Sequence, residues 1–333
     1  MYMKIAFIVP YFGAFPSAFQ LWLDSCAVNK DIDWLLFTDN HEPYLYPRNV
    51  HVYHVAFEEL QAWFQTLLGF KIWLGKPYKL CDFRPLYGFL FSKYIRGYDY
   101  WGYCDIDLVW GDLQSFIQRS DLEEYGMLSG WGHCSLYRNT ENINHLFECS
   151  TDALEECKKV LASNCNYLYD EVGIQKVVRK EGYRFAPLPL FDVRADKRKF
   201  YPTEATLPFM DRQLKKGLFK ISGGKVILYG IDDTGEMFNQ EFAYVHLAKR
   251  NMSVAVSSGN AGYLIVPNQY MPICEIDKKV IGKLVPRSDI YWHYQMNRIK
   301  SYMNIICGKN SVRWPGSRFQ KVCDIVFHRR GSF

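Results

Sequence analysis

Two aspartates stand two residues apart in an apolar and aromatic stretch, at Asp105 and Asp107 of Trp-Gly-Tyr-Cys-Asp-Ile-Asp-Leu-Val-Trp-Gly. On an extended backbone, residues i and i+2 point the same way, so both carboxylates can converge on one cation. Mg²⁺ and Mn²⁺ prefer oxygen ligands and often bind one or two carboxylates together with substrate phosphates. The pattern therefore predicts a metal and diphosphate site where a strand leaves its sheet. A solvated turn that carries two acids is the alternative, and the aromatic flanks favour the metal site.

A charged segment precedes this acid pair. Residues 76–88 mix Lys79, Asp82 and Arg84 with aromatic side chains. Cations and hydrogen-bonding groups so close to the acid pair predict a clamp on the phosphate and sugar of a donor. A helix start with local ion pairs is the alternative.

The chain opens as strand, helix and strand, over residues 4–10, 17–29 and 33–40. Such units build parallel sheets with right-handed crossovers, and ligands gather at the carboxyl ends of the strands. Pro10, Tyr11 and Asp39 fall at these ends. Asp39 can accept a hydrogen bond from a base or a ribose, or it can cap a turn.

Residues 126–139 combine glycines with aromatic and polar side chains. Gly130 permits close backbone approach, and Trp131 offers a flat apolar face for a sugar ring. His133 is either a polar contact or an ordinary strand residue.

Two further positions carry ionisable groups. Asp170 and Glu171 precede a helix expected near residues 175–178, where an Asp is a good cap. His246 lies in a predicted apolar strand over residues 242–250, and a lone His of this kind is usually a core residue.

The remaining pattern predicts an α/β fold. Further strands are expected at 51–55, 225–230 and 261–267, further helices at 57–68, 86–95, 113–124 and 142–157, and a loop or linker at 184–206. We expect a catalytic domain at residues 1–255 and a basic, mainly helical extension at 256–333.

The C-terminal residues 291–333 hold eight Lys or Arg and one acid, Asp324, with aromatic residues among them. This balance predicts peripheral docking on an anionic membrane surface. A helical subdomain that packs on the catalytic domain is the alternative.

The composition indicates the cellular compartment and the class of partner. The ten cysteines form no Cys-x-x-Cys pair, so we expect reduced thiols in a cytoplasmic protein. The N-terminus reads as a first strand rather than a signal peptide, and no apolar run reaches spanning length. A net charge of +5 does not demand a nucleic acid partner.

The motifs occur in an order that resembles the GT-A glycosyltransferases that build bacterial surface polysaccharide. The matching segments are Asp105-Ile106-Asp107, Gly130-Trp131-Gly132, Asp170-Glu171 and His246. The resemblance covers roughly residues 4–255. It departs in the tail, which has no counterpart, and after His246, where Leu-Ala-Lys-Arg names no single family.

This resemblance implies a Rossmann-like, mostly parallel central sheet with flanking helices. It also implies a divalent cation, Mn²⁺ or Mg²⁺, held by Asp105, Asp107 and His246, which would neutralise a leaving diphosphate. The donor would be a nucleotide-diphosphate sugar, most readily a UDP-sugar. The implied donor contacts are Pro10, Tyr11 and Asp39 for base and ribose, and Lys79, Asp82, Arg84, Asp105 and Lys249 for the rest.

The acceptor implied is a glycan or a lipid-linked glycan, contacted by Gly130, Trp131 and His133. In an inverting enzyme, Asp170, beside Glu171, would take the acceptor proton. In a retaining enzyme it would position the sugar or the acceptor. We expect the reaction to invert the anomeric configuration. We expect the protein to lie in the cytoplasm, either free or on the inner face of the membrane.

Two other classes share these features. A sugar nucleotidyltransferase also pairs carboxylates on a metal, and it releases pyrophosphate rather than a nucleoside diphosphate. A non-catalytic protein that binds nucleotides or sugars would use the acids structurally.

Overall fold

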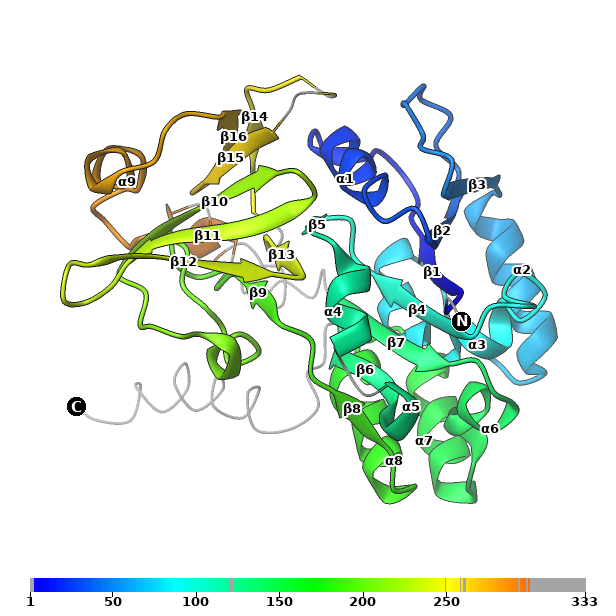
Figure 1. Cartoon of the computed structure of the whole chain (residues 1–333). Coiled ribbons are helices and arrows are strands. Elements are labelled where there is room, and N and C mark those ends of the chain that lie inside the picture. The colour runs from blue at the N-terminus through cyan, green and yellow to red at the C-terminus, as the bar shows by residue number, and fades with distance from the viewer. Residues whose placement is uncertain are drawn as a thin grey trace, which may run out of the picture.

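The computed structural model describes residues 3–119, 122–248, 250–257, 259, 262–292, 294–297 and 299. Within these residues the strands form three sheets, which Figure 1 shows side by side. The central sheet has the order β3-β2-β1-β4-β7-β6-β8, the second sheet β12-β11-β10-β15-β16-β14, and the small sheet β5-β13-β9.

The first half of the central sheet is parallel. It contains β1 (Ile5–Pro10), β2 (Ile32–Thr38), β3 (Val50–His54) and β4 (Tyr100–Cys104). β1 lies between β2 and β4 and pairs with both in parallel. With α1 (Phe19–Cys26) between β1 and β2, this confirms the predicted strand, helix and strand.

The second half of the central sheet reverses direction. β7 (Cys134–Arg138) is antiparallel to β4, and β6 (Gly126–Trp131) is antiparallel to β7. β8 (Arg184–Ala186) runs parallel to β6 at the edge. The chain therefore has a mixed α/β fold whose central sheet is parallel on one side.

Helices cover both faces of the central sheet. Side chains of β1 alternate between two apolar clusters, with Phe7 on one side and Ile8 on the other. The first cluster includes α1 and α4 (Leu113–Arg119). The second includes α2 (Phe57–Leu68), the 3₁₀ helix η1 (Pro77–Leu86), α3 (Tyr87–Leu90), α7 (Thr151–Ala162) and α8 (Ile174–Lys180). Two short helices, α5 (Leu122–Tyr125) and α6 (Glu141–Asn144), lie at the connections.

The small sheet joins the two larger ones. It contains β5 (Leu108–Trp110), β9 (Leu190–Asp192) and β13 (Tyr244–His246). One side chain from each of these strands belongs to the apolar cluster under the second sheet: Val109, Phe191 and Val245. The small sheet is thus fixed in place by packing, and the ends of its strands carry the candidate site described below.

The second sheet is built from later segments of the chain. Its strands are β10 (Lys216–Ser222), β11 (Lys225–Ile231), β12 (Met237–Phe242), β14 (Ser253–Val254), β15 (Gly262–Val266) and β16 (Gln269–Pro272). The hairpin between β10 and β11 turns at Gly223 and Gly224, which both have positive φ, as a two-residue turn with matching twist requires. α9 (Lys278–Leu284) covers the face opposite the small sheet.

Three local predictions are wrong. The helix predicted over 86–95 ends at Leu90, because the following aromatic residues form i to i+3 turns as they pack on the sheet. The strand predicted over 242–250 is divided, since Phe242 ends β12 and β13 belongs to the small sheet. The loop predicted over 184–206 contains β8 and β9.

The predicted domain boundary at residue 255 falls between β14 and β15, two strands of the second sheet. The division into 1–255 and 256–333 stays a prediction, and residues 300–333 lie outside the described part of the chain. Among the described residues, no helix is long and apolar enough to cross a membrane.

Candidate active site

The two aspartates lie on the link between two sheets. β4 of the central sheet ends at Cys104, and β5 of the small sheet begins at Leu108. About a quarter of each carboxylate side chain is exposed, 22% for Asp105 and 25% for Asp107. The pair therefore stands in a position that water and a ligand can reach, with buried strands before and after it.

β13 brings His246 to the acid pair. β13 runs antiparallel to β5, with His246 opposite Leu108, and the backbone N–H of Leu247 donates to the Asp107 carbonyl at 3.0 Å. The imidazole Nε2 of His246 lies 3.3 Å from Asp107 Oδ1 and 3.9 Å from Asp105 Oδ2. Among the described residues this buried nitrogen has no hydrogen-bond partner. Three ligand atoms of the kind that hold a divalent cation thus converge.

The other ring nitrogen of His246 is occupied. Its Nδ1 lies 2.7 Å from Asp192 Oδ1, at the end of β9. Burial by itself would lower the pKa of His246, but the charge of Asp107, and the hydrogen bond and charge of Asp192, raise it to about 10. Without a bound cation, the imidazole is therefore protonated at neutral pH and acts as the counter-charge of the acids.

His133 stacks on His246. The two rings are 4.3 Å apart at 17°, and His133 Nε2 is 3.1 Å from the Tyr244 hydroxyl. Burial and then the charge of His246 lower the pKa of His133 to about 3, so this ring is neutral. His133 is buried against the acid cluster, and its contact with an acceptor stays a prediction.

Arg84 connects the acid pair to a second acidic position. It comes from η1, forms ion pairs with Asp105 and, at 3.0 Å, with Asp170 Oδ2, and donates to the Gly132 carbonyl. Asp105 thus directs Oδ1 to Arg84 and Oδ2 towards His246. The Arg84 guanidinium therefore links the three segments that carry Asp105, Gly132 and Asp170.

Asp170 lies in a strained turn. Leu168 has φ +54, outside the range that a side chain prefers, and the π-helical turn η3 (Tyr169–Gly173) follows it. Asp170 is 3% exposed, and within the described chain its Oδ1 has no hydrogen-bond partner. Burial raises the pKa of Asp170 to about 8, although the charge of Arg84 acts in the opposite direction. A carboxyl with such a pKa can take up a proton near neutral pH.

The predicted acceptor segment lies beside this turn. The Glu171 side chain occupies the space next to Gly132, where a Cβ would approach its Oε1 to 2.5 Å, so a larger residue at 132 would displace Glu171. Gly130 has φ +77, and its carbonyl accepts a hydrogen bond from Gln175 Nε2 at 2.6 Å. Trp131 is 36% exposed. A flat aromatic face and an exposed carboxylate are therefore close to Asp170.

Lys79 and Asp82 serve a different purpose from the one expected. Both are fully buried and 2.8 Å apart, and Lys79 Nζ also donates to the carbonyls of Val160 and Cys165. Asp82 accepts from the backbone N–H groups of Tyr167 and Tyr169. The full burial of both side chains does not fit the predicted donor contact and matches the alternative, a helix start with a local ion pair. The pair instead anchors the segment that leads into Asp170.

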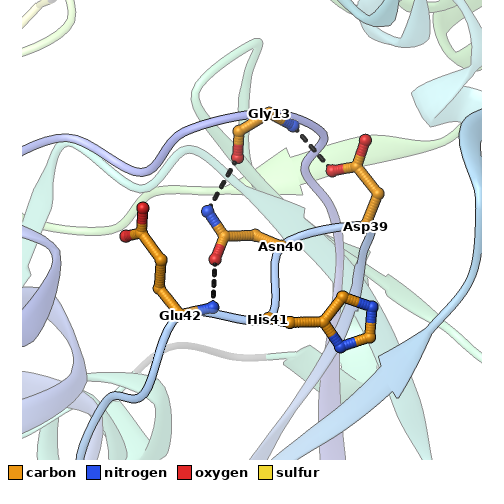
Figure 2. Close-up of a pocket in the computed structure, with 5 residues that line it drawn as sticks. All are labelled: Gly13, Asp39, Asn40, His41 and Glu42. Carbon is orange, nitrogen blue, oxygen red and sulfur yellow. Dashed lines mark hydrogen bonds between the residues drawn. The ribbon is translucent and has the colours of Figure 1, made fainter.

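A pocket of about 500 Å³ lies at the carboxyl ends of β1 and β2. It is lined by Gly13, Asp39, Asn40, His41 and Glu42. Figure 2 shows that Asp39 accepts from the Gly13 N–H, at 2.8 Å, while Asn40 bridges the Gly13 carbonyl and the Glu42 N–H. The ends of β1 and β2 thus form a pocket lined by oxygen atoms that can accept hydrogen bonds.

Tyr11 is a further predicted donor contact. It follows Pro10 at the end of β1, and its backbone N–H donates to the Phe37 carbonyl at 2.8 Å. Burial and then the charges of Asp107 and Asp105 raise the pKa of Tyr11, whose hydroxyl donates to the Ala14 carbonyl at 3.3 Å. Lys249, the remaining predicted donor contact, lies outside the described residues.

Sequence reasoning missed Asp192. It lies in the segment expected to be a loop, and the signal that would have found it is the run Leu-Pro-Leu-Phe-Asp, an apolar strand ended by an acid. Asp105, Asp107 and His246 lie together in the structure, and Arg84 and Asp170 join them through ion pairs.

Comparison with known proteins places the sequence in a family. A family model described as "Family of unknown function (DUF6625)" matches residues 7–274. The chain belongs to this DUF6625 family. The matched residues include the acid pair, Asp170, Asp192 and His246.

Other comparisons add little to the DUF6625 assignment. The sequence matches no curated protein. Among solved structures, it is similar to the galactosyltransferase LgtC in complex with donor and acceptor sugar analogs. The identity is 14%, over 57% of this chain and 75% of that chain, with a TM-score of 0.35. A likeness at this level carries no conclusion about the DUF6625 site.

Proposed function

We propose that this DUF6625 protein is a metal-dependent GT-A glycosyltransferase. It transfers a sugar from a nucleotide-diphosphate sugar, most readily a UDP-sugar, to a glycan or lipid-linked glycan of a surface polysaccharide. The observation that carries the proposal is the His246 Nε2 atom, which is buried, lacks a hydrogen-bond partner among the described residues and faces Asp107 and Asp105.

The donor set suits Mn²⁺ or Mg²⁺. Two carboxylates and one imidazole lie with ligand atoms within 4.8 Å of one another, and a diphosphate can supply further oxygens. A cation bound there would neutralise the charge that develops on the leaving nucleoside diphosphate. The residues present therefore fit this group.

The chain's own residues would hold the donor on both sides of the acid pair. The pocket at Asp39 presents carboxylate and carbonyl oxygens, which suit the hydroxyl donors of a ribose. Tyr11 would contact the base or ribose. Arg84 supports Asp105 from the opposite side, and Lys249 keeps its proposed role as a second cation.

The acceptor would lie against Trp131, with Glu171 beside it. In an inverting reaction, Asp170 Oδ1 accepts the proton of the acceptor hydroxyl, and that oxygen forms a bond to the anomeric carbon. The bond from this carbon to the diphosphate oxygen breaks, and its electron pair leaves with the nucleoside diphosphate. Burial raises the pKa of Asp170 and makes its carboxylate a stronger base, while the charge of Arg84 lowers the pKa and favours the carboxylate form that must take up this proton.

The decisive experiment is a panel of UDP-, GDP-, ADP- and dTDP-sugars incubated with the full chain, with and without Mn²⁺. We expect slow, metal-dependent hydrolysis of one donor, with a nucleoside diphosphate and free sugar identified by mass spectrometry. Release of pyrophosphate from a sugar phosphate and nucleoside triphosphate would instead identify a nucleotidyltransferase. Binding of a donor without any turnover, with or without added glycan acceptors, would support a binding protein.

The tail would direct the enzyme to its acceptor. Residues 291–333 carry eight cations against Asp324, which suits peripheral attachment to an anionic cytoplasmic membrane face where a lipid-linked acceptor waits. Most of this segment lies outside the described residues, so its attachment is tested in solution.

A further inference from the structure

Two sides of the His246 imidazole are held by neighbouring side chains. Nδ1 is bound by Asp192 at 2.7 Å, and one ring face stacks on His133 at 4.3 Å. The backbone of His246 is paired on both sides, with Leu108 of β5 and with Asp192 of β9. Nε2 is the ring nitrogen that faces the acid pair, 3.3 Å from Asp107 Oδ1 and 3.9 Å from Asp105 Oδ2.

Asp192 is itself held by two threonines. Thr203 Oγ1 donates to Asp192 Oδ2 at 2.7 Å, and the Asp192 N–H donates to Thr206 Oγ1 at 2.7 Å. The N–H of Thr203 also donates to the Asp192 carbonyl at 3.0 Å. With both carboxylate oxygens engaged, Asp192 has one orientation, and this orientation is transmitted to His246.

An imidazole can bind a cation through Nε2 only when its proton is on Nδ1. A carboxylate that accepts from Nδ1–H fixes this tautomer, orients the ring and makes the free nitrogen a better ligand. We propose that Asp192 is a positioning residue that prepares His246 Nε2 for a divalent cation shared with Asp105 and Asp107. This inference rests on the proposed function and assigns a role to a residue in the segment expected to be a loop.

A second arrangement of the same side chains is the competitor. His133, Asp192 and His246 also place ligand atoms within 4.8 Å of one another and can gather an ion themselves. Their hydrogen bonds oppose this arrangement. Asp192 already uses Oδ1 for His246 and Oδ2 for Thr203, and His133 Nε2 is engaged with Tyr244, whereas His246 Nε2 has no hydrogen-bond partner in the described part of the chain.

The test measures Mn²⁺ affinity of the full chain from the electron paramagnetic resonance of free Mn²⁺, with UDP present. Asp192→Asn keeps an oxygen that can accept from Nδ1–H but loses the charge, and we expect affinity to fall about tenfold. Asp192→Ala loses the acceptor as well, and affinity should fall by up to about 100-fold. Asp196→Asn is the matched control, since this acid lies in the same loop and pairs only with Arg194 among the contacts described. Its affinity should equal that of the wild type.

Spin-echo modulation by the bound imidazole nitrogen supplies a readout that a purely structural role would not change. The modulation should be present in the wild type and in Asp192→Asn, and lost or altered in Asp192→Ala protein that remains folded by circular dichroism. His133→Phe, which retains the stacking, should bind Mn²⁺ within a few fold of the wild type.

Three results separate the possible failures. Equal Mn²⁺ affinity in the wild type and both Asp192 variants would overturn the positioning role while leaving the metal site intact. Loss of binding in His133→Phe would assign the ion to the competing arrangement. A wild-type chain that binds no Mn²⁺, even with UDP, would overturn the metal-dependent function together with this inference.

Discussion

The ion pair between Lys79 and Asp82 allows a sharp test of how the site is held. Both side chains are fully buried, three positions apart and 2.8 Å from each other. Asp82→Asn keeps the shape and removes the charge, so the Lys79 ammonium is left in the interior without a counter-charge, held by the carbonyls of Val160 and Cys165 and by the Tyr167 ring. Removing one partner of a buried pair costs about 3–5 kcal/mol, because the remaining charge is uncompensated.

The chain offers a matched control. Lys158 and Glu155 form a pair with the same spacing and nearly the same separation, 2.9 Å, but their side chains are 38% and 64% exposed. Glu155→Gln should cost less than about 1 kcal/mol, because water screens and replaces the interaction. The comparison isolates burial as the cause.

Thermal unfolding followed by circular dichroism measures both variants. At roughly 2 °C or more per kcal/mol for a chain of this size, Asp82→Asn should lower the melting temperature by at least about 6 °C. Glu155→Gln should change it by no more than about 2 °C. Adding Lys79→Met to Asp82→Asn should recover part of the loss, since the unpaired ammonium is then absent.

Equal melting temperatures for the two single variants would refute the reasoning, because the buried and exposed pairs would then contribute alike. The reasoning would also be refuted if the Lys79→Met, Asp82→Asn double variant lost as much stability as Lys79→Met alone and Asp82→Asn alone added together. Asp82→Asn should also affect the proposed activity. Asp82 holds the backbone N–H groups of Tyr167 and Tyr169, so turnover should fall as the segment before Asp170 loosens.

Five further predictions address the site and the C-terminal tail. Asp107→Ala should abolish transfer and Mn²⁺-dependent nucleotide binding while the circular dichroism spectrum is retained, and near wild-type turnover in Mn²⁺ would rule out the metal site. His246→Ala should fold and weaken Mn²⁺ and diphosphate binding, measured by calorimetry, and an unfolded variant would instead assign His246 to the core. Asp170→Asn should retain donor binding and lose roughly 10²-fold or more in turnover. The pKa of Asp170 is raised above its unfolded value to about 8, mainly by burial, so its stability contribution is present in full below about pH 4 and is lost as the pH rises through 8. Urea unfolding should therefore show wild-type stability falling relative to Asp170→Asn between these pH values, and a constant difference would contradict the raised pKa. Truncation near residue 290 should end flotation with anionic vesicles but preserve donor hydrolysis, and full-length protein that ignores such vesicles at low salt would exclude membrane docking.

The local pattern of the sequence was sufficient for several elements. The continuous apolar run of β1, the following amphipathic helix and the apolar run of β2 were predictable, because hydrophobic periodicity follows from the period of each backbone conformation. α2 matches its predicted range, 57–68. The position of Asp105 and Asp107 after a buried strand was also readable, since it depends only on neighbouring residues.

The contacts of the candidate site could not be read in this way. Arg84 and Asp170 are 86 positions apart, and His246 and Asp192 are 54 apart, so no local period relates them. Their meeting depends on how β5, β9 and β13 pair in the small sheet, and short strands of three residues carry almost no sequence signal of their own.

Burial separated residues that look alike in the sequence. Lys79, Asp82 and Arg84 belong to one charged segment of η1, yet Lys79 and Asp82 are fully enclosed whereas Arg84 reaches Asp105 and Asp170. The sequence determined which charges were available and on which elements they lie. Only the tertiary structure decided which of them face one another, because a charge in the interior is tolerated only where packing brings a partner to it.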